Sequence, residues 1–127
     1  MIAVDTSALM AILLGEPEAD RCISALERDG ALLLSAGTMA EALIVADRRS
    51  VGREMARLID GLGFEIVPLT AVAARRVALA YATWGKGQHR AALNFGDCFA
   101  YDVAKTNGCP LLYVGQDFRQ TDVEGLV

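Results

Sequence analysis

The stretch Met1-Ile2-Ala3-Val4-Asp5-Thr6-Ser7-Ala8-Leu9 decides the fold, because within it an apolar strand passes directly into a helix. Residues 2–5 form a short apolar run that predicts a buried β-strand. Thr6 or Ser7 supplies a hydroxyl that is expected to cap the helix predicted over residues 8–14. A short apolar strand followed at once by a helix is typical of a parallel sheet with helices on its faces.

The same alternation of strand and helix continues along the chain. Further short strands are predicted at residues 31–34, 64–67 and 111–114, with a short final strand around 122–123. The helices expected around them cover residues 17–30, 38–48, 50–60, 71–83 and 94–107. The predicted N-terminal caps of the later helices are Thr38, Ser50, Thr70 and Asn94. This order predicts an α/β fold in which helices cover both faces of a parallel sheet.

The composition is that of a folded domain, and we expect one domain over residues 1–127. Hydrophobic residues make up 54% of the chain, yet no apolar run reaches the roughly 20 residues needed to span a bilayer. A signal peptide is not expected either, since the chain has no basic leader. The chain has an odd number of cysteines, and they are widely spaced: Cys22, Cys98 and Cys109. They are expected to be reduced thiols of a cytoplasmic protein.

The formal net charge of −4 argues against broad, nonspecific adhesion to nucleic acid, which normally needs a basic surface. It does not exclude an enzyme that acts on nucleic acid, because acids gathered in one pocket can be neutralised by a metal ion. A zinc site is not expected, since the chain has one histidine and no clustered cysteines.

Four acidic residues stand beside apolar segments, where a carboxylate is costly unless something pairs with it. Asp5 and Asp117 each follow a predicted strand, Glu41 lies early in the helix after the second strand, and Asp97 lies near a helix N-terminus. Ligands of parallel sheets bind beyond the carboxyl ends of the strands. All four acids are therefore expected at the same edge of the sheet.

Each acid also has an ordinary explanation when it is taken alone. Asp5 can form an Asx turn ahead of a helix, and Asp117 can start a turn in a loop. Asp97 can complete a capping box with Asn94, and Glu41 can lie on the surface, as most glutamates do.

Taken together, the four acids favour a metal site over these separate explanations. Two like charges about 4 Å apart cost about 4 kcal/mol at a surface-like dielectric, so a cluster of acids persists only with a bound cation or raised pKa values. Oxygen ligands favour Mg²⁺ or Mn²⁺, and the chemistry expected of such a site is metal-assisted cleavage of a phosphodiester.

Four segments carry a resemblance to a known family. They are Met1–Leu9, Ala40–Ala42, Ala91–Phe99 and Gly115–Val123, and in this order they span nearly the whole chain. The sequence resembles PIN-domain ribonucleases of the VapC toxin type. The resemblance implies a three-layer α/β/α domain with a central parallel sheet of four or five strands. It also implies an endoribonuclease, dependent on Mg²⁺ or Mn²⁺, that is the toxin of a type II toxin–antitoxin pair.

The same resemblance assigns the metal ligands. It implies that Asp5 and Asp97 bind the ion directly, and that Glu41 binds it directly or through water and helps to activate the nucleophile. Asp117 is expected to complete the metal site or to orient its waters. The chain departs from the family at Gln116, where relatives often carry a second acid, and this lowers the negative charge beside Asp117.

Further residues are expected to support this site or to bind partners. Thr6 and Ser7 are expected to form hydrogen bonds to the acids or to a substrate phosphate. Thr121 and Asp122 are expected to support the metal ligands. The glycine-flanked loop before the last long helix carries Lys86, His89 and Arg90. These side chains either contact RNA or are simply solvated. The family implies a homodimer and a small antitoxin partner. The antitoxin would bind in an apolar groove of this chain. The residues that form this groove, unless they belong to the core, are Leu9, Ile12, Leu13, Ile44 and Val45.

Other classes of protein share parts of this pattern. A phosphoacceptor receiver domain also gathers acids at strand ends, but it needs a lysine after a late strand, and none follows Val114. A noncatalytic binding module would keep the fold without the activity, and the presence of all four acids argues against it. A DNA-cleaving flap-nuclease relative is disfavoured, because the compact chain lacks room for an arch that grips a duplex.

Overall fold

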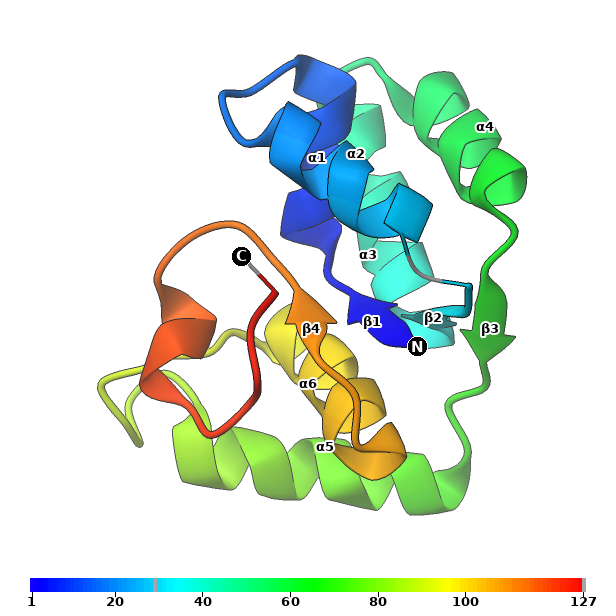
Figure 1. Ribbon diagram of the computed structural model, residues 1–127. Helices are drawn as coiled ribbons and strands as arrows, with labels where there is room; N and C mark the ends of the chain where they lie inside the picture. Colours follow the sequence, from blue (N-terminus) through cyan, green and yellow to red (C-terminus); the bar gives the residue numbers. More distant parts are fainter. Residues whose placement is uncertain (29, 127) are drawn as a thin grey trace.

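The computed structural model of the protein describes residues 1–28 and 30–126 (Figure 1). The predicted order of the helices and of the first four strands is confirmed. The first half contains β1 (Ile2–Val4), α1 (Thr6–Leu14), α2 (Ala19–Arg28), β2 (Leu32–Ser35), α3 (Ala36–Arg48) and α4 (Gly52–Leu62). The second half contains β3 (Glu65–Val67), α5 (Ala71–Trp84), α6 (Phe95–Asn107), β4 (Leu111–Leu112) and the short 3₁₀ helix η1 (Asp117–Gln120).

The four strands form one parallel sheet in the order β3-β2-β1-β4. The chain steps outward from β1 to β2 and then to β3, and afterwards crosses back to place β4 on the other side of β1. The strand order therefore reverses between β1 and β4. In open α/β sheets, ligands bind at such a switch point, beyond the carboxyl ends of the strands.

Alternate residues of the strands build two separate cores, one on each face of the sheet. Ile2 and Val4 point to one face and pack with α1 to α4, whereas Ala3 points to the other face and packs with α5 and α6. Figure 1 shows the two groups of helices on opposite sides of the sheet. The predicted three-layer α/β/α arrangement, with four strands in the sheet, is thereby confirmed.

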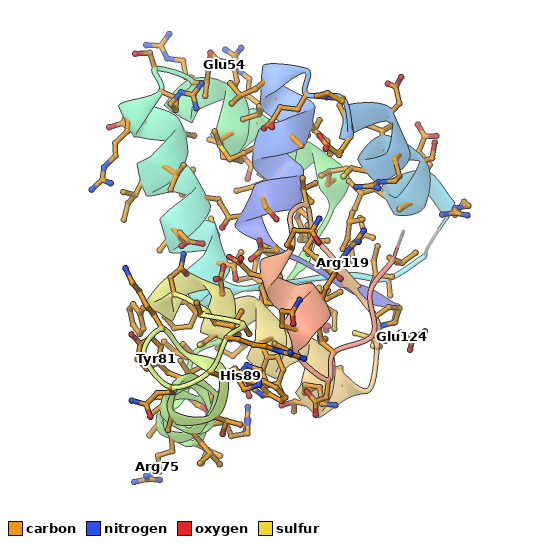
Figure 2. The ribbon with its side chains drawn as sticks, turned by 90° about the vertical axis from the view of Figure 1, so that its left-hand side faces the viewer. Glu54, Arg75, Tyr81, His89, Arg119 and Glu124 are labelled. Atoms are coloured by element: carbon orange, nitrogen blue, oxygen red, sulfur yellow. The ribbon has the colours of Figure 1, made fainter. Side chains whose placement is uncertain are left out.

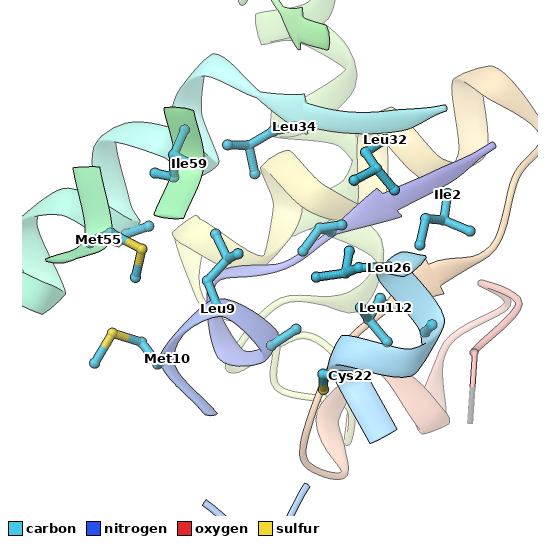
Figure 3. Packing of buried hydrophobic residues seen from close by; sticks show 14 of the residues in the cluster. Ile2, Leu9, Met10, Cys22, Leu26, Leu32, Leu34, Met55, Ile59 and Leu112 are labelled. Atoms are coloured by element: carbon cyan, nitrogen blue, oxygen red, sulfur yellow. The ribbon is translucent and has the colours of Figure 1, made fainter. Parts of the chain in front are cut away.

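The larger core lies between the sheet and α1 to α4 (Figure 3). Leu9 is fully buried in it, against strand residues such as Leu34, and Met55 and Ile59 reach it from α4. A fully buried leucine side chain contributes about 1.5–3 kcal/mol relative to an exposed one. Cys22 is a buried free thiol in the same core.

The opposite face is closed by α5 and α6, which an ion pair joins. Nε of Arg76 donates to Oδ1 of Asp102 at 2.7 Å, and Nη2 donates to Oδ2 at 3.2 Å. Thr106 also donates to Oδ1 of Asp102, at 3.2 Å. Asp102 is buried, and this two-pronged contact pairs its charge, which would otherwise be costly in the core.

Two of the predicted helix caps are confirmed and three predictions are wrong. Thr70 and Asn94 cap α5 and α6 as expected. The cap of α1 is Asp5, not Thr6 or Ser7, because the Asp5 carboxylate accepts the Ser7 backbone N–H at 3.0 Å.

Helices α3 and α4 also start differently from the prediction. Ser35 caps α3, since its Oγ accepts the Gly37 N–H at 3.1 Å, while Thr38 is buried within the helix. Ser50 lies in the left-handed region with φ 61°, outside the helix, and α4 starts at Gly52 without a side-chain cap.

The C-terminal segment differs from the prediction as well. Strand β4 ends at Leu112 rather than at residue 114, and no strand forms around residues 122–123. Instead the tail runs beside β4, where Leu111 donates to the Glu124 carbonyl at 2.8 Å and accepts from Leu126 N–H at 3.1 Å. No helix in the described part of the chain is long and apolar enough to cross a membrane.

Candidate active site

The four acids come from four segments that meet at the switch point of the sheet. Asp5 directly follows β1, and Asp117 is the first residue of η1, which follows β4. Glu41 lies in the second turn of α3, after β2, and Asp97 lies in the first turn of α6. Figure 2 looks at this side of the molecule, with η1 and its Arg119 near the centre.

Asp5 is the most deeply buried of the four, at 3% exposure. Its Oδ2 accepts two hydrogen bonds from Ser7, from the backbone N–H at 3.0 Å and from the hydroxyl at 2.6 Å. The Ser7 hydroxyl oxygen in turn accepts the Val114 N–H at 3.0 Å, which ties α1 to the end of β4. Oδ1 of Asp5 is buried and has no hydrogen-bond partner. A buried carboxylate oxygen without a partner is costly, and a cation would satisfy it.

Glu41 is fixed by a residue next to Asp5. Thr6 donates its hydroxyl to Oε1 of Glu41 at 2.6 Å, across the boundary between α1 and α3. On its other side the Glu41 carboxyl group packs against Gly96 of α6. The hydrogen bonds expected from Thr6 and Ser7 to acids of the site are therefore both present.

Asp97 is both a helix cap and a member of the acidic group. Its Oδ2 accepts the Asn94 N–H at 2.9 Å, and its own N–H donates to Oδ1 of Asn94 at 2.8 Å. This capping box holds one carboxylate oxygen and fixes the side chain at the start of α6. The two explanations considered from the sequence are therefore compatible, because the cap occupies only one oxygen.

The pKa values of two of the acids show that the four carboxylates influence one another. Burial, together with the charges of Asp5, Asp117 and Glu41, raises the pKa of Asp97 to about 7. Burial also raises the pKa of Asp5 to about 6, with a contribution from Glu41 that opposes the hydrogen bonds from Ser7. Like charges raise each other's pKa in this way when they lie close enough to interact.

The donor set suits a hard divalent cation, although the side chains do not yet enclose one. Among the described residues, no lysine, arginine or histidine forms an ion pair with any of the four acids. Nor are three or more Asp, Glu, His or Cys side chains of residues 1–28 and 30–126 arranged tightly enough to hold an ion. Carboxylate oxygens are what Mg²⁺ and Mn²⁺ prefer, and the unpartnered Oδ1 of Asp5 is free to bind one.

Comparison with known proteins identifies the family. Residues 2–124 match the PIN domain. "VapC ribonuclease Mb0640" of Mycobacterium bovis is 42% identical over 125 residues, which cover 96% of this chain and 95% of that protein. The chain belongs to the VapC ribonuclease family. "Ribonuclease VapC36" of Mycobacterium tuberculosis is 45% identical over 125 residues, covering 95% of this chain and 90% of the relative.

Solved structures of other proteins share the fold at low sequence identity. The crystal structure of Mycobacterium tuberculosis VapC20, described as a Sarcin-Ricin loop cleaving toxin, matches with a TM-score of 0.81 at 15% identity, over 99% of this chain and 98% of that one. A toxin–antitoxin complex from Klebsiella pneumoniae matches with a TM-score of 0.70 at 19% identity, over 96% and 93% of the two chains. These matches confirm the PIN-like fold.

In this VapC family member, Thr121 and Asp122 have partners other than the acids. The Thr121 hydroxyl donates to the Phe118 carbonyl at 2.7 Å and so closes η1. Asp122 accepts a hydrogen bond from Tyr101 at 2.6 Å and forms an ion pair with Lys105 at 3.2 Å, both on α6. Their described contacts thus stabilise the packing of the tail on α6.

The loop before α6 is ordered by its own contacts. Nδ1 of His89 accepts the Ala91 N–H at 3.0 Å, and the imidazole edge packs on Trp84 with ring centroids 4.8 Å apart. Lys86 and Arg90 are exposed in the same loop, which lies below η1 in Figure 2. His89 is thus engaged inside the loop, while the side chains of Lys86 and Arg90 are exposed to solvent.

The apolar residues predicted to form one groove fall into three places. Leu9 belongs to the core, which is one of the two alternatives that the sequence left open, and Leu13 is half-buried against the same core. Ile12 lines a hollow of about 410 Å³, the α2–α4 groove, together with Ile23, Leu26, Leu58 and Leu62. Ile44 and Val45 line another of about 580 Å³, the α3–α6 groove, together with Gly37, Glu41, Arg48, Phe95 and Phe99.

Sequence reasoning missed one contributor to the site. Gly96 stands directly before Asp97 in α6, and the space where its side chain would lie is filled by the Glu41 carboxyl group. A glycine inside a helix was the only available signal, because glycine is disfavoured there unless something needs its missing side chain.

Proposed function

We propose that the protein is a divalent-metal-dependent endoribonuclease and the toxin of a type II toxin–antitoxin pair. The observation that carries this proposal is the group of four acids at the sheet edge, whose mutual charge raises the pKa of Asp97. The ribonuclease names of relatives more than 40% identical over almost the whole chain support it. The buried free thiols of Cys22 and Cys98 support a cytoplasmic location.

The metal ligands would be Asp5 and Asp97, with Glu41 and Asp117 completing the set. When bound, a divalent ion lowers the pKa of a water and offsets the charge of the scissile phosphate. Oδ1 of Asp5 is buried and unpartnered, and it is the oxygen of the four acids that most needs a cation. Mg²⁺ and Mn²⁺ both fit this all-oxygen set.

The chain's own hydrogen bonds decide which oxygens take part in the reaction. Ser7 holds Oδ2 of Asp5, and Asn94 holds Oδ2 of Asp97. Each of these contacts leaves Oδ1 of the same aspartate free. Thr6 holds Oε1 of Glu41, so Oε2 is the atom that accepts a proton from the attacking water. In this proposal the proton acceptor is oriented by a hydrogen-bond partner on α1, a different helix.

The test is cleavage of a structured RNA by the wild type and by Asp5→Asn and Asp97→Asn. Cleavage is expected with Mg²⁺, is expected to stop in EDTA, and is expected to be absent in both variants although they fold. Asp60→Asn, at an exposed position on α4, is the matched control and should cleave like the wild type. Full activity of either site variant, or cleavage that persists in EDTA, would reject the proposal.

The two apolar grooves suit two protein partners. We assign the α2–α4 groove to a helical segment of the antitoxin and the α3–α6 groove to a second copy of the chain. Ile44 is 55% exposed and Phe95 is 65% exposed beside the α3–α6 groove, so large apolar side chains stand exposed together at this surface. Toxin–antitoxin complexes among the structural neighbours support an antitoxin partner.

Two substitutions test these assignments against each other. Ile44→Glu should convert the dimer to a monomer, measured by light scattering after gel filtration, and should leave copurification with the antitoxin intact. Ile23→Glu, in the α2–α4 groove, should abolish copurification and leave the dimer intact. Each variant is the control for the other, and the opposite pattern would exchange the two assignments.

A further inference from the structure

Gly96 occupies a position where the fold does not need a glycine. It lies inside α6, and its backbone is not in the left-handed region that requires glycine at places such as Gly108. Alanine is preferred over glycine inside a helix, since glycine loses more conformational freedom on folding. The reason for a glycine at this position must therefore be sought in the space around it.

The Glu41 carboxyl group fills that space. A methyl group at position 96 would overlap Oε2 and Cδ of Glu41, and Oε1 would lie 2.7 Å away. Thr6 holds Oε1 from the other side at 2.6 Å. The carboxyl group thus lies between the Thr6 hydroxyl and the backbone of Gly96, one residue from Asp97.

Gly37 provides an instructive contrast in the same interface. A methyl group at position 37 would meet the ring of Phe99, at 2.5 Å from Cγ. That ring is buried, so a substitution there would disturb the packing of α3 on α6. At Gly96 the obstructing atoms are instead the end of a flexible side chain, which can move without unfolding the protein.

We propose that Gly96 is a positioning residue, whose missing side chain determines where the Glu41 carboxylate stands beside Asp97. The proposal rests on the proposed function, in which Glu41 is a metal ligand and accepts a proton. It predicts that stability and activity separate. An alanine at position 96 keeps the helix and even favours it, but displaces the carboxylate from the other acids.

The first experiment compares Gly96→Ala with Asp60→Ala, at an exposed position of α4. Gly96→Ala is expected to melt within about 4 °C of the wild type or above it. Its kcat for RNA is expected to fall by about 100-fold, the loss that a misplacement of about 1 Å can cause. Asp60→Ala should match the wild type in activity. Wild-type kcat in Gly96→Ala would overturn the proposal.

A double-mutant cycle tests whether the effect passes through Glu41. Mn²⁺ affinity is measured by calorimetry for the wild type, Gly96→Ala, Glu41→Ala and the double variant. Gly96→Ala should weaken Mn²⁺ binding in the wild-type background and should change nothing once the Glu41 carboxylate is gone. A further loss of affinity in the double variant would overturn the proposal, because Gly96 would then act independently of Glu41.

A crystal structure of Gly96→Ala separates this inference from the proposed function. The Glu41 carboxylate is expected to be displaced and its contact with Thr6 broken, whether or not the protein cleaves RNA. If the wild type fails to cleave RNA, the proposed function fails while this structure still tests the positioning. A Glu41 carboxylate that stays in its wild-type position would overturn the inference.

Discussion

Replacing Asp97 by asparagine should stabilise the metal-free protein while it abolishes the activity. Burial and the charges of Asp5, Asp117 and Glu41 raise the pKa of Asp97 from 3.8 to about 7. The folded protein therefore retains a proton that the unfolded chain releases near pH 4. Asparagine is neutral at every pH, yet keeps an oxygen that can accept the Asn94 N–H of the capping box.

The magnitude follows from the pKa shift. A rise from 3.8 to about 7 corresponds to an upper limit of about 4 kcal/mol, at about 1.4 kcal/mol per pKa unit. Asp97 is only half-buried, and solvent screening together with the favourable position at a helix N-terminus reduces the expected gain to about 2 kcal/mol. The loss of stability caused by the raised pKa of Asp97 in the folded protein is absent below about pH 4, grows as the pH rises and is complete above about pH 7.

Urea unfolding in EDTA at pH 4.5 and pH 8 measures this difference. Asp97→Asn should exceed the wild type by about 2 kcal/mol in free energy of unfolding at pH 8 and by little at pH 4.5. Adding Mg²⁺ at pH 8 should stabilise the wild type more than the variant, because the variant lacks a ligand. The reasoning is refuted if the variant is less stable than the wild type at pH 8, or if the difference is the same at both pH values.

Three further predictions follow from single contacts. Thr6→Val removes the 2.6 Å hydrogen bond to Glu41 and should lower the free energy of unfolding by about 1 kcal/mol, with a larger relative loss of kcat, measured by thermal melts and RNA cleavage. Asn94→Ala removes half of the capping box and should destabilise the protein by about 1 kcal/mol in the same melts, and an unchanged melt would contradict the cap. Lys86→Gln combined with Arg90→Gln should reduce the slope of log affinity for single-stranded RNA against log salt by about 1.4, and an unchanged slope would reject contact with phosphates.

The sequence predicts those features that depend on the order and periodicity of residues. Short apolar runs such as residues 31–34 can only be buried strands between helices, so the parallel sheet follows from them. The convergence of Asp5 and Asp117 follows in turn, because both come directly after strands of the same sheet. Asn94 is predictable as a cap because Asp97 follows at the spacing of a capping box.

What the sequence does not predict is set by contacts between distant segments. Ser35 and Thr38 both carry hydroxyls near the start of α3, and only the packing decides that Ser35 caps the helix while Thr38 is buried. Asp122 cannot be assigned to Tyr101 without knowing that the tail folds back onto α6. Gly96 is explained only by Glu41, which reaches it from a helix on the other side of the sheet edge.

The loop between α5 and α6 divides the protein into two complementary halves. A cut between Arg90 and Ala91 would leave Asp5 and Glu41 on one fragment and Asp97 and Asp117 on the other. It would also separate β1 from β4, the pair of neighbouring strands at the switch point. If cleavage needs all four acids, as proposed, each fragment alone is inactive, and reassembly of the two fragments makes a split enzyme whose activity depends on whatever brings them together.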